Sequence, residues 1–253
     1  MQNKNTAIAI ALGAVCALGP FATDMYVAAM PRMAEDLATT DANIQLSMMT
    51  YFTGFTLGQL FYGPVSDKTG RKPMIYLALA IFVLASIGCV LSTGATGLLV
   101  FRFLQGIGGS IGMVIATASI RDVHTGQAAA RLMSMVVLVL GIAPVLAPLL
   151  GSLVLQMGDW RLIFALLGAL GVVVAVITIT MLPETRMPEL RAMSRPGDAL
   201  HWYGRLLFTR SFIPYAGALA LAQGGFFAYI AGSSFVRSMS MASRRSPIRS
   251  SSA

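Results

Sequence analysis

The sequence contains little charge. Asp, Glu, Lys and Arg make up 11% of its 253 residues, whereas a soluble globular domain carries about 25%. Hydrophobic residues make up 56% of the chain, and its mean hydropathy is +0.74. This composition excludes an ordinary soluble domain and predicts a polytopic membrane protein of the all-α class.

Cysteine and histidine are scarce as well, with two residues of each. Cys16 and Cys89 lie inside apolar segments, where a thiol usually packs as a small apolar group rather than in a disulfide or metal site. His124 and His201 lie in predicted loops, where we expect them to be solvated. The sequence also lacks HExxH, P-loop and GxSxG motifs and paired intramembrane aspartates. We therefore expect no enzyme, no catalytic residue, no metal and no cofactor.

No cleavable signal peptide is evident. The first apolar segment continues well past the length of a signal-peptide core and has no clear cleavage site before its polar end. In a soluble protein the net charge of +8 would indicate nucleic-acid binding. Here most basic residues fall in short loops between apolar segments, where they set membrane topology. We therefore expect the chain to lie in a lipid bilayer and not to bind nucleic acid.

Long apolar segments dominate the rest of the chain. A membrane-spanning helix needs roughly 20 mostly apolar residues, and the segments that qualify are 7–30, 44–65, 73–91, 97–120, 132–157, 162–182 and 212–236. The first six predict a six-helix bundle within residues 1–182. Residues 183–211 are expected to form a cytoplasmic loop with an interfacial helix around Trp202 and Tyr203, and residues 212–236 a seventh helix.

The basic residues orient these spans. With the amino terminus inside, eleven basic residues fall in inward loops, and only Arg32 and Arg161 fall in outward loops. Short cytoplasmic loops carry the excess of Lys and Arg, so we expect the amino terminus to be cytoplasmic. The inward set is Lys4, Lys68, Arg71, Lys72, Arg121, Arg131, Arg186, Arg191, Arg195, Arg205 and Arg210.

The tail, residues 237–253, breaks this charge rule. Seven crossings place it outside, yet it carries four Arg, seven Ser and no acidic residue. It has no apolar periodicity, and we expect it to be disordered. It is either a natural basic tail or a departure from the reading frame of a parent sequence near Arg237. The abrupt end of the hydrophobic pattern favours the second explanation.

Residues 63–72 form the densest run of charge and turn residues between two spans in the first half of the chain. The apolar sequence on both sides predicts that they form a tight loop at a membrane face. Pro64 is expected to end the preceding helix, and the glycines supply backbone freedom. Asp67 has Arg71 and Lys72 within reach. A solvated turn that only sets topology is the alternative.

Only Asp24 and Arg102 are ionisable residues well within the spans. Such a residue is costly unless it faces protein or water, which makes each a functional candidate. At 1.5 Å per residue, Asp24 lies roughly 9 Å and Arg102 roughly 8 Å from the outer face, so the two can pair if their helices are neighbours. Gln105, one turn beyond Arg102, extends the polar stripe. We expect either a structural ion pair or a proton- or substrate-sensitive site, in which protonation of Asp24 releases Arg102.

Glycine and proline recur inside the spans. Pairs of glycines four residues apart, Gly54 with Gly58 and Gly108 with Gly112, are typical of helix-packing faces. In the fifth span, two prolines one turn apart remove backbone donors and bend or loosen the helix, and flanking glycines let a neighbour approach. This pattern favours a helix that flexes or seals against another helix, with a simple kink as the alternative. Its residues are Gly141, Pro144, Pro148 and Gly151.

Four motifs together resemble the major facilitator superfamily and, within it, the bicyclomycin-resistance (Bcr/CflA) group of drug:proton antiporters. Residues 63–72 resemble the superfamily's cytoplasmic signature, and the prolines and glycines of the fifth span resemble its antiporter motif. The segment 23–31, with Thr23-Asp24-Met25-Tyr26, resembles the group's first-helix motif. Arg102-Phe103-Leu104-Gln105-Gly106 on the fourth span completes the set, and Pro183-Glu184-Thr185 after the sixth span also fits. The resemblance runs from about residue 6 to about residue 235.

The resemblance implies the first half, plus one helix, of a transporter whose substrate cavity lies between two six-helix halves. It implies that the first and fourth helices line the cavity, with Asp24 as the proton or cation site and Arg102 as its partner. Tyr26 and Gln105 are then expected along the substrate path. It also implies a cytoplasmic gate that latches onto the other half, formed by Gly63, Asp67, Gly70, Arg71 and Lys72. A weaker, inverted counterpart of this gate is expected at residues 158–161.

The function expected from this resemblance is proton-coupled multidrug efflux across the bacterial inner membrane. A small amphiphilic drug would leave the cell as protons enter, which would confer antibiotic resistance. Because most of a second half is not present in the pattern of spans, we expect a truncated form that does not transport by itself. The alternative is a seven-helix receptor or binding protein without ion coupling. A retinal-binding version is excluded because residues 212–236 contain no Lys.

Overall fold

A computed structural model describes residues 2–222 and 224–225 of the chain. The chain divides into two compact units, Met1–Pro196 and Gly197–Ala253. The domain boundaries predicted at residues 182, 211 and 236 remain predictions. The described part of the chain is helical and contains no strand, as the all-α class requires.

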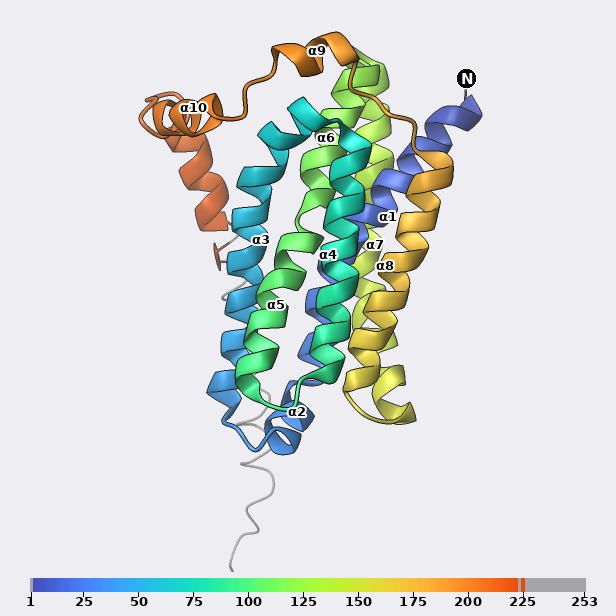
Figure 1. The fold of residues 1–253 in the computed structure, drawn as a ribbon, viewed down its shortest axis with the longest axis vertical. Coiled ribbons are helices and arrows are strands. Elements are labelled where there is room, and N and C mark those ends of the chain that lie inside the picture. The colour runs from blue at the N-terminus through green and yellow to red at the C-terminus, as the bar shows by residue number, and fades with distance from the viewer. Residues whose placement is uncertain (1, 223, 226–253) are drawn as a thin grey trace, which may run out of the picture. The chain divides into compact units, whose positions relative to one another are not determined.

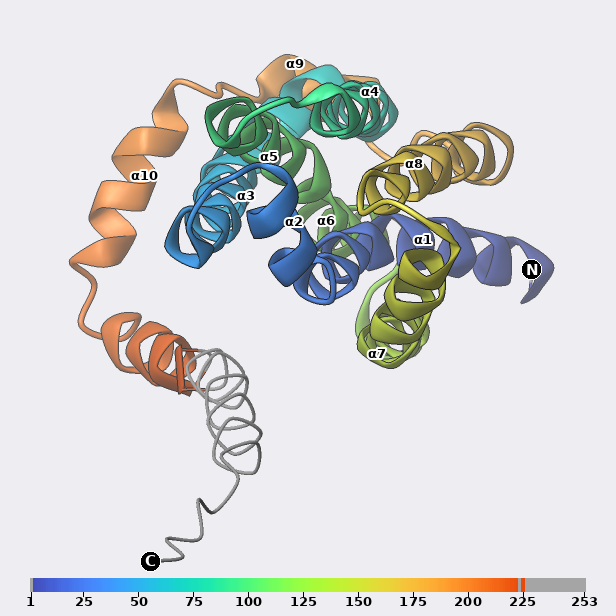
Figure 2. The same ribbon diagram turned by 90° about the horizontal axis from the view of Figure 1, so that it is seen from below.

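The first unit is a helical bundle. Its elements are α1 (Gln2–Val27), α2 (Met30–Asp36), α3 (Asp41–Thr69), α4 (Arg71–Leu91), α5 (Ala95–Gly109), α6 (Ile111–Val123), α7 (Gly126–Met157), α8 (Arg161–Met181) and α9 (Pro188–Met193). The long helices run side by side, with α2 at one end and α9 at the other (Figure 1). The end view shows α5 beside α3 and α4, and α1 beside α7 and α8 (Figure 2).

Five segments of the described residues are long and apolar enough to cross a membrane: Asn5–Val27, Arg71–Leu91, Ala95–Val123, Gly126–Met157 and Arg161–Met181. They coincide with the first, third, fourth, fifth and sixth predicted spans. The predicted second span, 44–65, lies inside the 29-residue helix α3. That helix is long enough to cross, but α3 is not among the five apolar segments.

The second unit contains α10 (Asp198–Leu207) and a shorter apolar helix, Ile213–Ala222. Trp202 and Tyr203 lie in α10, which confirms a helix there, and its location at the membrane interface remains a prediction. The rest of the predicted seventh span, apart from residues 224–225, and the tail 237–253 lie outside the described residues.

The structure corrects the prediction for residues 63–72. They do not form a loop, because α3 continues through Pro64 to Thr69 and only Gly70 separates it from α4. A proline keeps a helical φ and removes one backbone donor, and membrane helices tolerate that loss where neighbouring groups compensate. The chain reverses at Gly70, whose φ of +106° strains any residue with a Cβ.

Close helix packing explains most of the glycines. A Cβ at Gly54 would overlap the Phe103 carbonyl of α5, and a Cβ at Gly58 would overlap the Ser110 hydroxyl. The pair therefore forms a packing face on α3, as predicted. Gly108 instead packs against α4, where a Cβ would lie 2.7 Å from the Ala78 carbonyl oxygen, and Gly112 packs against the backbone of α1. The fourth predicted span is irregular at Ser110, where α5 ends and α6 begins.

Candidate functional site

Arg102, on α5, lies at the centre of the bundle and is fully buried. Its Nη1 donates to the Ala22 carbonyl oxygen of α1 at 3.1 Å and to Oε1 of Gln105 at 2.7 Å. Gln105 in turn donates through Nε2 to the Ser86 hydroxyl of α4 at 2.8 Å. The chain of hydrogen bonds confirms that Arg102 and Gln105 lie on the same side of their helix, and it joins three helices.

Aromatic rings surround the guanidinium of Arg102. Its Cζ lies 4.3 Å from the ring centroid of Tyr26 on α1, 4.3 Å from that of Tyr51 on α3 and 5.9 Å from that of Phe164 on α8. Within the described part of the chain, Nε and Nη2 of Arg102 have no hydrogen-bond partner. A desolvated cation over an aromatic face gains about 2 kcal/mol or more. The rings therefore offset part of the cost of burying this charge.

Asp24 does not pair with Arg102, contrary to the prediction. Although the two residues lie at similar depth, no ion pair joins them; the half-buried carboxylate accepts a hydrogen bond from the Thr23 hydroxyl at 3.0 Å. The reason is helical geometry, since 3.6 residues per turn place Asp24 about 200° around α1 from Ala22 and from Tyr26. Those two residues face Arg102, and Asp24 therefore points away from them. Asp24 carries a carboxylate in a spanning segment without a basic partner among the described residues.

Tyr26 fixes α1 against α3. It is fully buried, and its hydroxyl contacts the Ile44 carbonyl oxygen at 3.2 Å and the Ser47 hydroxyl. Its ring packs against Phe164, with centroids 6.0 Å apart. Tyr26 therefore belongs to the packed surroundings of Arg102, and its predicted place along a substrate path remains a prediction.

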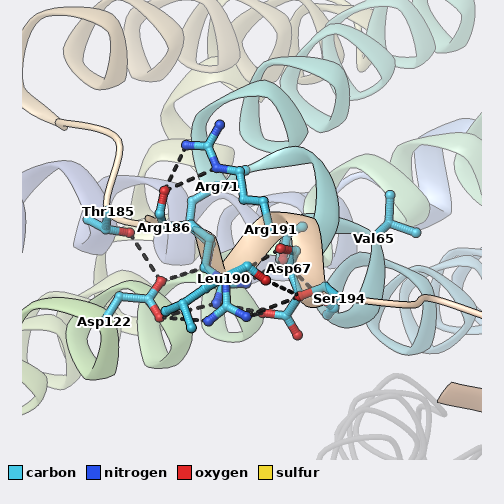
Figure 3. Close-up of polar contacts among 12 residues, drawn as sticks. Val65, Asp67, Arg71, Asp122, Thr185, Arg186, Leu190, Arg191 and Ser194 are labelled. Atoms are coloured by element: carbon cyan, nitrogen blue, oxygen red, sulfur yellow. Dashed lines mark hydrogen bonds and ion pairs between the residues drawn. The ribbon is translucent and has the colours of Figure 1, made fainter. Parts of the chain in front are cut away.

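A second polar centre, the Arg71 cluster, lies at the end of the bundle where α3 gives way to α4 (Figure 3). Arg71 is buried, with 3% of its side chain exposed, and pairs with Asp67 at 2.8 Å and with Asp122 of α6 at 2.9 Å. Its Nη1 also donates to the Ser66 hydroxyl at 2.7 Å. The segment after α8 completes the cluster with Glu184, Thr185, Arg186 and Arg191.

Glu184 stabilises the start of α4. Its two carboxylate oxygens accept the backbone N–H groups of Arg71 and Lys72 at 3.0 and 3.1 Å, and these are donors that a helix start otherwise leaves unpaired. Partial burial raises the pKa of this carboxyl, but bonds from the backbone N–H groups of Arg186, Arg71 and Lys72, together with the charge of Arg191, outweigh it and leave the pKa lowered. Glu184 is thus held in its charged form.

The Arg161 cluster lies at the opposite end. Arg161, the first residue of α8, pairs with Asp36 at 2.7 Å and with Asp159 at 2.9 Å, and donates to the Ser92 carbonyl oxygen at 3.2 Å. Trp160 donates to the same Asp36 at 3.0 Å, and these bonds lower the Asp36 pKa. An arginine at a helix start joined to two aspartates repeats the arrangement around Arg71, which supports the predicted counterpart at residues 158–161.

The predicted antiporter helix is α7, and it runs through both Pro144 and Pro148. Gly151 lies against α1, where a Cβ would be 3.0 Å from the Met25 carbonyl oxygen. Gly141, by contrast, has no atom within 4 Å of a Cβ position. The prediction that a neighbouring helix approaches closely is therefore confirmed at Gly151. It is wrong at Gly141, within the described residues. The flexing role of the helix remains a prediction.

The sequence did not identify four residues around the two arginines. Tyr51 contacts Arg102 and Ser86 accepts from Gln105, whereas Asp122 pairs with Arg71 and Arg186 pairs with the same Asp122. Tyr51 carried a usable signal, because it precedes Gly54 by three residues and Gly58 by seven and so shares their helix face. Ser86 and Asp122 come from α4 and α6, and Arg186 from the segment between α8 and α9. Among the described residues, no group of three or more His, Cys, Asp or Glu could hold a metal ion.

Comparison with known proteins decides the family. A match to the Major Facilitator Superfamily covers residues 11–244. The chain belongs to the major facilitator superfamily. It is 38% identical over 235 residues to an uncharacterized MFS-type transporter of Bacillus subtilis, YdgK, covering 92% of this chain and 58% of that one. It is also 30% identical over 236 residues to a bicyclomycin resistance protein homolog of Haemophilus influenzae, covering 93% and 59%.

The fold agrees with this membership of the major facilitator superfamily. The structure of a proton:xylose symporter, XylE, superposes with a TM-score of 0.67 at 14% identity, covering 85% of this chain and 52% of that one. The predicted all-α transporter fold and the absence of an enzyme are therefore confirmed, and the seven-helix receptor alternative is set aside. The chain spans a little under three fifths of the length of the two curated relatives.

Proposed function

We propose that this chain supplies the first half of a proton-coupled drug exporter of the bacterial inner membrane. The bicyclomycin-resistance name of one relative supports a drug as substrate, and the excess of basic residues at the Arg71 end supports a cytoplasmic location for that end. The observation that carries the proposal is Asp24: a half-buried carboxylate in a spanning segment with no basic partner among the described residues. An intramembrane acid of this kind is typical of proton relays.

In the proposed mechanism, Asp24 holds either a proton or the cationic group of an amphiphilic drug. The fixed positive charge of Arg102, tied to α1 through the Ala22 carbonyl, disfavours a second cation nearby. Binding of the drug from the inside releases the proton, and protonation from the outside releases the drug. The Arg71 cluster acts as the inward gate and α7 as the flexing helix that reseals the cavity.

Asp24→Asn tests the proposal through binding of tetraphenylphosphonium, an apolar cation, to the full chain in nanodiscs at a series of pH values. In the unchanged protein, affinity should rise with pH and each bound cation should release a proton. In the variant, binding should be independent of pH and about tenfold weaker or more, which corresponds to a loss of about 1.4 kcal/mol. Asp41→Asn, at the exposed start of α3, is the matched control and should change neither property. Binding without pH dependence in the unchanged protein would sink the proposal.

A further inference from the structure

Arg102 carries a positive charge inside the bundle, and its surroundings must compensate that charge. This side chain is fully buried, yet among the residues that the structure describes no carboxylate pairs with it and two of its nitrogens have no hydrogen-bond partner. A buried, unpaired charge normally costs several kcal/mol. Asp24 is the one acidic residue in the Asn5–Val27 span, but it does not take this role.

Tyr51 is one of the two tyrosines whose rings lie 4.3 Å from the guanidinium of Arg102. It is fully buried, its ring centroid lies 4.3 Å from Cζ of Arg102, and its hydroxyl donates to the Gly19 carbonyl oxygen of α1 at 3.4 Å. It stands on α3, whereas Arg102 stands on α5. The ring therefore reaches the guanidinium across a helix interface and is held there by a third helix.

The packing of α5 is shaped around this tyrosine. A Cβ at Gly106 would overlap the Tyr51 carbonyl oxygen, and a Cβ at Gly109 would lie 2.9 Å from the Tyr51 hydroxyl oxygen. Two glycines on α5 thus make room for Tyr51 at the level of Arg102. Tyr62, also nearly buried on α3, makes no ring contact with Arg102 among the described residues.

We propose that Tyr51 is a positioning residue: its ring face replaces a carboxylate counter-ion for Arg102 and so leaves Asp24 free to exchange its proton. This inference rests on the proposed function of Asp24. Among the other helices that pack against α1, α7 and α8 contain no ionisable side chain in residues 132–157 and 162–181. The helix α6 also packs against α1 and carries Arg121 and Asp122 near its end, where Asp122 pairs with Arg71.

Replacement of Tyr51 by leucine should change the pH dependence of cation binding. In Tyr51→Leu the guanidinium of Arg102 loses one of the two rings that lie 4.3 Å from it, and only Tyr26 remains at that distance. We expect the less restrained side chain to move toward the Asp24 carboxylate. A carboxylate beside a cation gives up its proton more readily. The pH midpoint of tetraphenylphosphonium binding should then move toward acid by about one unit or more. Tyr51→Phe keeps the ring face and loses only the hydroxyl, so it should keep the original midpoint.

The test compares the unchanged full chain, Tyr51→Phe, Tyr51→Leu and the matched control Tyr62→Leu in nanodiscs. Tyr51→Met is a second non-aromatic variant should the leucine chain fail to fold. Two quantities are measured: the pH midpoint of tetraphenylphosphonium binding, and the 15N NMR signal of the Arg102 guanidinium, assigned by its loss in Arg102→Lys. Both should change in Tyr51→Leu or Tyr51→Met and stay unchanged in Tyr51→Phe and Tyr62→Leu.

The outcomes separate the two proposals. Equal behaviour of the two leucine variants in both measurements overturns the positioning role and leaves Tyr51 as an ordinary packing residue. If the unchanged chain binds the cation without pH dependence, the proposed function of Asp24 fails. In that case the guanidinium signal alone decides whether Tyr51 positions Arg102, and a shift in Tyr51→Leu but not in Tyr51→Phe still supports it.

Discussion

At the scale of single residues, the bundle buries two arginines in different ways. Arg71 is neutralised by two aspartates, Asp67 and Asp122. Arg102 meets a carbonyl, an amide and aromatic faces, and no acid in the part of the chain that the structure describes. A buried charge must be compensated, but only Arg71 is compensated by carboxylates. The surroundings of Arg102 leave the one acidic residue of the neighbouring span, Asp24, available for proton exchange in the proposed mechanism.

Glu184 gives a residue-scale prediction of pH dependence. Its pKa in the folded protein lies below the ordinary value of 4.5, so its contribution to stability is fully present above that value and is lost as the pH falls through the lowered pKa. Glu184→Gln should lower the free energy of unfolding by roughly 1 kcal/mol at neutral pH, as for a lost helix cap. The difference should shrink as the pH falls.

Chemical unfolding in detergent, followed by circular dichroism at several pH values, measures this difference. Glu189→Gln is the matched control, because Glu189 is an exposed acid in α9 of the same segment. It should have little effect at any pH. A loss in Glu184→Gln that stays constant down to strongly acidic pH would contradict the assignment.

At the scale of elements, backbone proximity joins α3 to α5. The face of α3 that carries Tyr51, Gly54 and Gly58 lies directly on α5. Lipid offers no hydrophobic drive between helices, so such close contacts supply much of the attraction. The same face brings Tyr51 to Arg102. Packing and the candidate site therefore depend on one helix interface.

Gly54→Ala should break this interface. The added methyl group would overlap the Phe103 carbonyl, which is backbone and cannot rotate away, so we expect the free energy of unfolding to fall by about 1–3 kcal/mol. Gly141→Ala is the control, because nothing lies within 4 Å of its Cβ position, and alanine favours a helix by up to about 1 kcal/mol over glycine. It should be neutral or stabilising. Thermal unfolding in nanodiscs compares the two, and equal losses would contradict the packing argument.

At the scale of the whole molecule, polar clusters hold both ends of the first unit. The Arg71 cluster joins α3, α4 and α6 to the segment after α8, and the Arg161 cluster joins the ends of α2, α4 and α8. Because these clusters link the helices at both ends, the bundle is suited to move as one rigid body. Alternating access in this family requires such a body to rock against a second one.

The 253-residue chain alone should therefore not transport. In liposomes with a pH gradient it should accumulate no tetraphenylphosphonium above the level of empty liposomes, although the proposed function expects it to bind this cation. The full-length Haemophilus relative, reconstituted in the same way, provides the comparison. Gradient-driven movement of the cation by the chain alone would show that the second half is dispensable.

Much of the fold follows from the sequence because hydrophobic length is a local property. Apolar runs of about 20 residues have few alternatives to a spanning helix, so the positions of α1, α4, α7 and α8 could be predicted. The end of α3 could not. Pro64 and the charges after it are typical of a loop, but contacts with α6 and with Glu184 favour continuation of the helix to Gly70.

The candidate site was predicted only in part, for a related reason. Depth along a helix follows from counting residues, so the sequence could predict that Asp24 and Arg102 lie at one level. Direction around the helix depends on which face packs inward. That face of α1 carries Ala22 and Tyr26 and so turns Asp24 away from Arg102. Tyr51 and Asp122 come from other helices, and only packing brings them to their arginines.

The sequence by itself determined that this protein is an all-α membrane protein with Asp24 and Arg102 as charged residues inside its spans, because burying charge in lipid is costly wherever the chain folds. Only the tertiary structure decided what each charge meets. Arg102 meets aromatic rings and a carbonyl, Arg71 meets two aspartates, and Asp24 meets no base among the described residues. Partners drawn from distant helices depend on packing, and packing is a property of the whole bundle.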